Sequence, residues 1–231
     1  MKNYFYDMLP GEELEILKYI PTRPEFVNWI GEKWADRIAV SNLEQKFTYA
    51  EMCSRIARRR AFLNAQGLKK GDKVAIFERN SIDAIESFLA VTSAGYVAIN
   101  LPTMLPAQAV IGCCMRFQVS LLIVREEFKE MAAGAPCKVV LSNEMADQEA
   151  PVASVDKNEP AAIFFTGGTT GAPKVAILPH RAIMRGSLNG CYAPGHQCNG
   201  ERTIGLLPLS HVFGLIYGTL SMFYIGATWF D

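Results

Sequence analysis

Short apolar runs recur along the sequence, and a stretch with helical periodicity separates most of them from the next. The runs show little alternation with polar residues, which is typical of strands buried on both faces of a parallel sheet. Because helices connect parallel neighbours, this order predicts an α/β fold in which a mostly parallel sheet is flanked by helices. The predicted strands are KVAIF at 73–77, YVAIN at 96–100, SLLIV at 120–124, KVVLS at 138–142 and AAIFF at 161–165.

The clearest predicted helix covers residues 48–67. Thr48 and Glu51 have the spacing of a capping box at its start, and Gly67 is a suitable stop. The basic cluster RIARRR at 55–60 lies within this helix, and we interpret it as one solvated face. Further helices are predicted at 80–95, with Asn80 or Ser81 as the cap, at 106–117, and as a short turn at 126–133, before a surface loop at 143–159.

The composition limits the possible partners and compartments. Twenty-three basic and twenty-three acidic residues give a formal net charge of zero, so no basic field indicates nucleic acid. The N-terminal MKNYFYDMLP lacks the apolar core of an export signal, and the six cysteines follow no disulfide framework. These features predict a cytoplasmic protein with reduced cysteines.

One cluster resembles a metal site. Cys191, His196 and Cys198 lie within eight residues, but a closed zinc site needs four ligands. We therefore predict no bound metal in this part of the chain.

A glycine-rich loop interrupts the pattern after the last predicted strand. Glycines let backbone N–H groups converge on a ligand, threonine hydroxyls add neutral donors, and a lysine adds the compact charge that often binds polyphosphate. The loop is therefore predicted to bind phosphate. Its candidate residues are Thr166, Gly167, Gly168, Thr169, Thr170, Gly171 and Lys174.

Two familiar phosphate loops do not fit this segment. A Walker loop places lysine directly after the last glycine, whereas Ala172 and Pro173 intervene here. A dinucleotide fingerprint runs straight into a helix, but the β-prone KVAIL follows Pro173. A second strand is thus predicted after the loop, and a flexible hairpin without a ligand remains an alternative.

Phe165 to Lys174 resemble the signature of the adenylate-forming (AMP-binding) enzymes, which include acyl-CoA synthetases. The departures are Gly167 for the usual serine and Val175 for the usual glycine. The stretches FTYAEM, GLKKGDKVAIFERNS, AGYVAINLP, PHRAI and LLPLSHVFGL are also similar to family segments, in the family's order. The resemblance implies a lead-in at 1–28 and, over 29–231, the N-terminal subdomain of the acyl-CoA synthetase-like fold.

The resemblance also implies a function. Such an enzyme would use ATP to adenylate a carboxylic acid and then pass the acyl group to CoA or another thiol. The loop and Lys174 would bind ATP phosphates, and His211 would be the catalytic residue beside the carboxylate. Val212 stands where amino-acid-activating relatives commonly carry aspartate, which favours fatty, aryl or other simple acids. Without the resemblance, His211 would be interpreted as a core histidine in an apolar helix.

In such a family the chain would continue beyond Asp231. The glutamate that binds Mg²⁺, the aspartate for the ribose and the small C-terminal domain are therefore expected to be absent, and the fragment alone is expected to be inactive. We also expect a homodimer through surfaces left uncovered by the truncation.

Two other functions stay open. Residues 203–230 contain no Lys, Arg, Asp or Glu, which would suit a membrane-associated protein, although Pro208 and Gly226 interrupt the run. The chain could also be a non-catalytic nucleotide-binding module.

Overall fold

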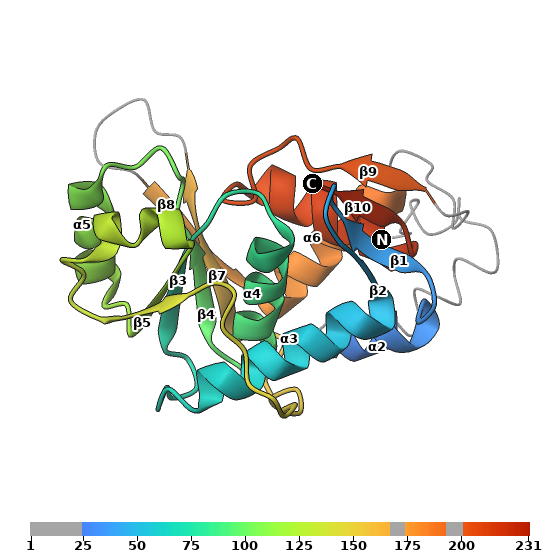
Figure 1. The fold of residues 1–231 in the computed structure, drawn as a ribbon, viewed down its shortest axis with the longest axis horizontal. Coiled ribbons are helices and arrows are strands. Elements are labelled where there is room, and N and C mark those ends of the chain that lie inside the picture. Colours follow the sequence, from blue (N-terminus) through green and yellow to red (C-terminus); the bar gives the residue numbers. More distant parts are fainter. Residues whose placement is uncertain (1–24, 167–173, 193–200) are drawn as a thin grey trace, which may run out of the picture.

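The part of the chain that the structure describes contains two β-sheets joined by helices (Figure 1). A computed structural model describes residues 25–166, 174–192 and 201–231. The larger sheet has the strand order β6-β5-β3-β4-β7-β8, and only the β7–β8 pair is antiparallel. The predicted mostly parallel sheet is therefore confirmed. Its strands are β3 (Lys73–Phe77), β4 (Val97–Asn100), β5 (Leu121–Val124), β6 (Lys138–Leu141), β7 (Pro160–Thr166) and β8 (Lys174–Pro179).

Helices cover both faces of this sheet. Along β3, Val74 and Ile76 belong to one apolar cluster, and Ala75 and Phe77 belong to another on the opposite face. The first cluster includes the buried sides of α3, α4 and α6, and the second includes those of α5 and two short 3₁₀ helices. The bounds are α3 (Tyr49–Asn64), α4 (Ile82–Ser93), α5 (Ala107–Phe117), α6 (His180–Tyr192), η2 (Glu126–Phe128) and η3 (Glu130–Ala132).

The helix ends follow local side-chain chemistry. Thr48 and Glu51 form the predicted capping box at the start of α3. Ser81 caps α4, because its hydroxyl accepts the N–H of Ala84 at 3.0 Å. Asn80, the other predicted cap, has a different role described below. The single short helix predicted at 126–133 is instead the pair η2 and η3.

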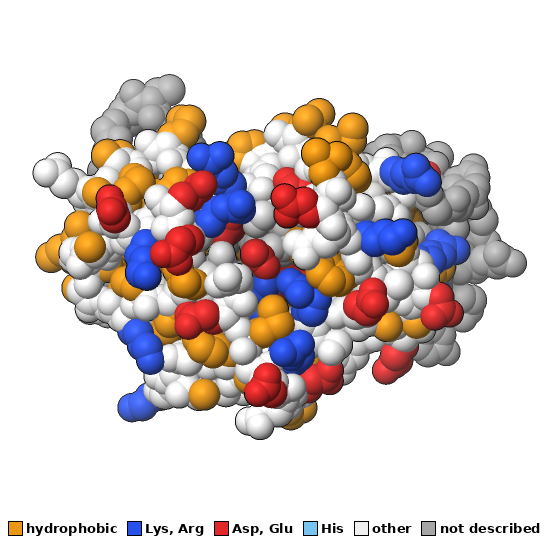
Figure 2. Space-filling view, in the orientation of Figure 1, with side chains coloured by type: hydrophobic (Ala, Val, Ile, Leu, Met, Phe, Trp, Pro, Cys, Tyr) orange, Lys and Arg blue, Asp and Glu red, His pale blue; other side chains and the backbone are white. Residues whose placement is uncertain are grey.

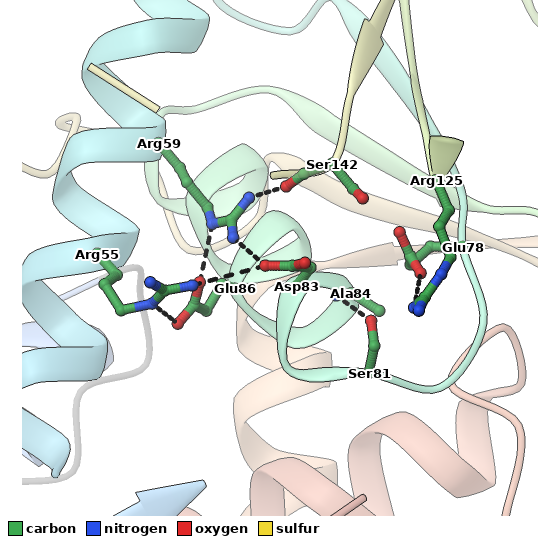
Figure 3. A network of polar contacts seen from close by, with 9 residues as sticks. All are labelled: Arg55, Arg59, Glu78, Ser81, Asp83, Ala84, Glu86, Arg125 and Ser142. Carbon is green, nitrogen blue, oxygen red and sulfur yellow. Dashed lines mark hydrogen bonds and ion pairs between the residues drawn. The ribbon is translucent and has the colours of Figure 1, made fainter. Parts of the chain in front are cut away.

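The interpretation of the arginine cluster as a solvated face is wrong. Arg59 is 3% exposed and Arg60 is 2% exposed. Arg59 lies against α4, where its guanidinium binds Glu86 at 2.8 Å and contacts Asp83, and it also donates to the Ser142 carbonyl (Figure 3). Buried arginines need such partners, and the partners are distant in sequence, so the cluster alone did not reveal them.

A second, four-stranded sheet was not predicted. Its order is β2-β1-β10-β9, and β1 pairs in parallel with β10, so early and late segments of the chain lie side by side. Trp229 of β10 is fully buried, and a Cβ at Gly205 would lie 2.1 Å from its ring, so only glycine fits there. The strands are β1 (Ile38–Ser41), β2 (Lys46–Thr48), β9 (Arg202–Ile204) and β10 (Thr228–Phe230).

Three further helices pack around this smaller sheet. The late apolar run forms a π-helix, η4, which continues directly into α7 and then β10. At the other end of the described chain, α2 packs its Phe26 against Tyr224 of α7, with ring centroids 4.6 Å apart. The bounds are α2 (Phe26–Lys33), η4 (Phe213–Leu220) and α7 (Ser221–Tyr224).

Candidate functional site

The predicted phosphate loop connects two strands at one edge of the larger sheet. Thr166 ends β7, Lys174 begins β8, and the two residues pair across the antiparallel ladder. Both are exposed. The predicted strand after the loop is therefore confirmed, and no helix follows the loop directly. The predicted ligands Gly167, Gly168, Thr169, Thr170 and Gly171 lie outside the described residues.

This edge is the carboxyl edge of the parallel strands. β3, β4 and β7 are parallel neighbours, so their last residues meet there. The connection after β3 leads to α4 on one face of the sheet, and the connection after β4 leads to α5 on the other. Open α/β sheets bind ligands at such a switch point, outside the carboxyl ends of the strands.

Two asparagines at the switch point hold the segment that precedes η4. Asn80, just after β3, donates its side-chain amide to the carbonyls of Gly205 (2.7 Å) and Leu207 (2.8 Å). Its amide oxygen accepts the N–H of Leu209 at 2.9 Å. Asn100, the last residue of β4, donates to the Leu209 carbonyl at 3.0 Å. These bonds fix the segment two residues before His211 at the carboxyl edge.

His211 is exposed at the start of the helical segment, so the alternative of a core histidine is wrong. Its Nδ1 accepts the backbone N–H of Phe213 at 3.2 Å. In the neutral ring this arrangement assigns the proton to Nε2, which leaves an N–H donor on the other side of the imidazole. An exposed donor of this kind can bind a carboxylate oxygen.

Sequence reasoning missed the polar residues that follow β3 and β5. Glu78 lies directly after β3, and its Oε1 accepts from Arg125, which follows β5, at 3.2 Å (Figure 3). Burial raises the pKa of Glu78, while the nearby Ser142 and Arg125 oppose that change. The second carboxyl oxygen of Glu78 is buried without a partner in the described part of the chain. The sequence did offer one indication of Glu78, Asn80 and Asn100. All three are polar residues at, or just after, the end of a buried parallel strand.

His180, in the PHRAI segment, is the first residue of α6. The side chain is buried, and burial lowers its pKa to about 4. It is therefore neutral near pH 7. Its backbone N–H is satisfied by the carbonyl of Glu159 at 3.2 Å, so the residue has a structural position at the start of the helix.

The described residues contain no group of three or more His, Cys, Asp or Glu side chains that could hold a metal ion. His196 and Cys198 of the sequence cluster lie outside the described residues, as does the side chain of Cys191. Across residues 25–166, 174–192 and 201–231, no helix combines the length and apolar character that crossing a membrane requires.

The chain belongs to the AMP-binding enzyme family, whose sequence pattern matches residues 27–230. It is 26% identical over 222 residues to 4-chlorobenzoate–CoA ligase from an Arthrobacter species, covering 89% of this chain and 42% of that protein. It is also 26% identical over 191 residues to 2-succinylbenzoate–CoA ligase of Bacillus cereus, covering 81% of this chain and 39% of that protein. The chain thus spans less than half the length of these relatives.

Solved structures share the fold. ATP-bound MatB from Rhodopseudomonas palustris superposes with a TM-score of 0.79 at 21% identity, covering 90% of this chain and 45% of that one. The acyl-adenylate complex of o-succinylbenzoate CoA synthetase (MenE) from Bacillus subtilis superposes with a TM-score of 0.81 at 22% identity, covering 90% and 43%. The architecture is therefore that of the N-terminal subdomain of adenylate-forming enzymes.

Proposed function

We propose that this chain is the N-terminal part of an ATP-dependent ligase that adenylates a carboxylic acid and transfers the acyl group to CoA or another thiol. Membership of the AMP-binding family supports this proposal, together with one structural observation. Thr166 and Lys174, which flank the predicted loop in sequence, lie at the same carboxyl edge of the sheet as the segment that leads to His211. Several relatives are named CoA ligases, and these names support the proposal that the acyl acceptor is a thiol.

Thr166 and Lys174 suit the phosphates of ATP. The two residues are paired positions at the ends of β7 and β8, both are exposed, and they supply a hydroxyl and an ammonium group. In the proposed reaction, a carboxylate oxygen attacks the α-phosphorus, the bond to the pyrophosphate oxygen breaks, and pyrophosphate leaves. Lys174 and the glycine-rich loop would stabilise the negative charge that develops on the leaving group.

His211 would orient the acid. Its Nε2–H can donate to one carboxylate oxygen and leave the other oxygen to attack phosphorus. In the second step, a thiol sulfur attacks the acyl carbon, the bond from that carbon to the phosphate oxygen breaks, AMP leaves with that oxygen, and the thiol proton passes to water. Mg²⁺ would assist by neutralising phosphate charge, and we assign it no ligand among the described residues.

Val212 bears on the substrate class. It directly follows His211, and its side chain is partly buried and packs against the main apolar cluster. An apolar group at this position offers nothing to a substrate ammonium. We therefore propose a fatty, aryl or other acid without an α-amino group.

The decisive experiment incubates the complete gene product that contains this chain with ATP, CoA and a panel of carboxylic acids, and measures AMP release. AMP and thioester formed together with one class of acid are the expected result. Binding of ATP in calorimetry without AMP release from any acid would favour the nucleotide-binding module instead. The chain of 231 residues, assayed alone, is expected to form no thioester, because adenylation needs the whole nucleotide held in one geometry.

A further inference from the structure

A cationic cavity lies on the outer side of α6, with a volume of about 450 Å³. It is formed by the exposed side of α6, the turn that precedes β7, and one residue of η4. Its wall contains three positively charged groups, one amide and one phenol. The lining residues are Lys157, Arg181, Ala182, Arg185, Gly186, Asn189 and Tyr217.

Helical spacing explains why the polar groups gather. Arg181, Arg185 and Asn189 are four residues apart along α6, so they lie on one face of the helix. Lys157 is brought beside the start of this face because its carbonyl accepts the N–H of Arg181 at 2.9 Å. The first amides of α6 are therefore already bonded to backbone carbonyls, and side chains supply the positive charge of the cavity.

Two of these cations, Lys157 and Arg181, are not paired with the nearby carboxylate of Glu159. Glu159 forms an ion pair with Lys70 at 2.9 Å, on the other side of the turn. Arg181 donates its Nε to the neutral amide oxygen of Asn158 at 2.7 Å. Within the described part of the chain, neither Lys157 nor Arg181 forms an ion pair with a carboxylate. Two cations without acidic partners, at the wall of a cavity, favour an anionic occupant.

Two glycines of α6 let Tyr217 form the opposite wall. A Cβ at Gly190 would lie 3.0 Å from the Tyr217 ring, and a Cβ at Gly186 would lie 3.1 Å from Ile216. The absence of side chains at both positions lets η4 lie close to α6. The Tyr217 phenol is a hydrogen-bond donor, like the amide group of Asn189, so the wall combines neutral donors with positive charge.

We propose that this cavity binds an oxyanion group, a carboxylate or a phosphate, of a small molecule. Guanidinium groups match both oxyanions through paired N–H donors, and the ammonium, amide and phenol complete the set. The inference goes beyond the proposed ligase reaction, because it adds a binding site remote from the glycine-rich loop.

The oxyanion could come from two sources. One source is a carboxylate compound, which includes a second carboxylate of the acid in the proposed reaction, and that case rests on the proposed function. A phosphate compound could alternatively bind independently of the acid.

The test titrates the ¹⁵N-labelled chain with inorganic phosphate, glutarate and pentanoate, and follows the arginine Nε–H and Asn189 side-chain amide resonances by NMR. The double variant Lys157→Gln/Arg181→Gln should bind the preferred anion about tenfold or more weakly, because two charged donors are removed. The control variant Lys46→Gln/Lys69→Gln removes the same charge from exposed positions elsewhere and should bind like the wild type. The binding to the wild-type chain should also weaken as NaCl is raised.

The outcomes separate the sources. Binding of glutarate or pentanoate, with phosphate inert, identifies a carboxylate compound. Phosphate binding tighter than both acids identifies a phosphate compound. The proposal is overturned if no anion moves the resonances, or if the double variant and the wild type titrate alike. The single variant Lys157→Gln repeats the comparison if the double variant unfolds, and no arm depends on ATP or turnover.

Discussion

At the scale of single residues, Lys174 occupies a position that separates function from stability. It begins β8 with an exposed side chain opposite Thr166. Lys174→Ala should leave the free energy of unfolding nearly unchanged, since it removes no buried contact. In the complete protein it should slow ATP–pyrophosphate exchange by about tenfold or more, because one charge-assisted contact to phosphate contributes roughly 1.5–3 kcal/mol.

Exchange assays and urea unfolding of the same preparations check both halves of this prediction. Lys69→Ala, at another exposed lysine, is the matched control and should change neither quantity. ATP–pyrophosphate exchange at the wild-type rate in Lys174→Ala would contradict the phosphate-binding role proposed for this lysine.

His180 predicts a pH dependence of stability. Its pKa in the folded protein is about 4, lowered by burial, whereas an unfolded histidine has a pKa of about 6.5. Between these values the unfolded chain takes up the proton first, so stability is full above about pH 6.5 and is lost as the pH falls toward 4. The loss at pH 5 should be about 2 kcal/mol relative to pH 8.

The measurement is urea unfolding at pH 8 and pH 5. His180→Phe cannot titrate, so its unfolding free energy should lack this component of the pH dependence. His211→Gln removes an exposed histidine and should retain the full loss. An equal loss in wild type and His180→Phe would contradict the assignment.

At the scale of secondary-structure elements, a buried charge network joins α3 to α4. Glu86 is completely buried and accepts from Arg55 at 2.6 Å and from Arg59 at 2.8 Å. Arg59→Met would leave both Glu86 and Asp83 with Arg55 as the cation described beside them, and it would remove the bond to the Ser142 carbonyl drawn in Figure 3. Breaking a buried pair from one side typically costs about 3–5 kcal/mol.

This cost should be visible as a lower midpoint in urea unfolding. Lys129→Met provides the comparison, because the Lys129–Glu126 pair is exposed on both sides and should contribute less than about 1 kcal/mol. Equal effects of the two substitutions would mean that the buried network adds nothing to the α3–α4 contact.

The elements predicted from sequence were those with local signals. The five apolar runs became strands of the larger sheet, and the capping box at Thr48 marked the start of α3. The smaller sheet was missed because three of its four strands have only three residues, and because β1 pairs with β10 from the far end of the described chain. Without those partners, the short runs carry no periodic pattern that distinguishes them from loops.

The site was predicted in the same uneven way. The residues flanking the phosphate loop, and the position of His211, followed from motifs. Asn80 was considered only as a helix cap, yet it anchors the segment before His211 across a long sequence separation. Such a bond depends on how two elements distant in sequence pack together, and a single sequence does not show which elements pack.

At the scale of the whole molecule, an apolar surface surrounds the segment between β9 and η4. Figure 2 shows hydrophobic side chains gathered at the edge where Figure 1 places this segment. Leu206 is 80% exposed, Ile204 64% and Phe213 56%. Exposed apolar patches of this kind commonly bind a partner, so we expect the chain to self-associate in solution.

Light scattering across a dilution series should show a molar mass that rises with concentration above the 25.5 kDa of one chain. Leu206→Asp should shift this rise to higher concentration, because it places a charge in the apolar patch. Leu43→Asp changes an even more exposed leucine, in the β1–β2 turn, and should behave as the wild type. A monomer at every concentration would refute the expectation.

The parallel pairing of β1 with β10 also affects the order in which the two sheets can form during synthesis. The Tyr49 hydroxyl donates to the carbonyl of Ala227, 178 positions later, and Val40 pairs with Trp229. On a ribosome, β1 therefore emerges long before the strand that covers its edge, while the strands of the larger sheet find their neighbours sooner. The larger sheet can assemble first, and the growing chain must keep the β1–β2 hairpin from unintended pairing until residues 228–230 arrive.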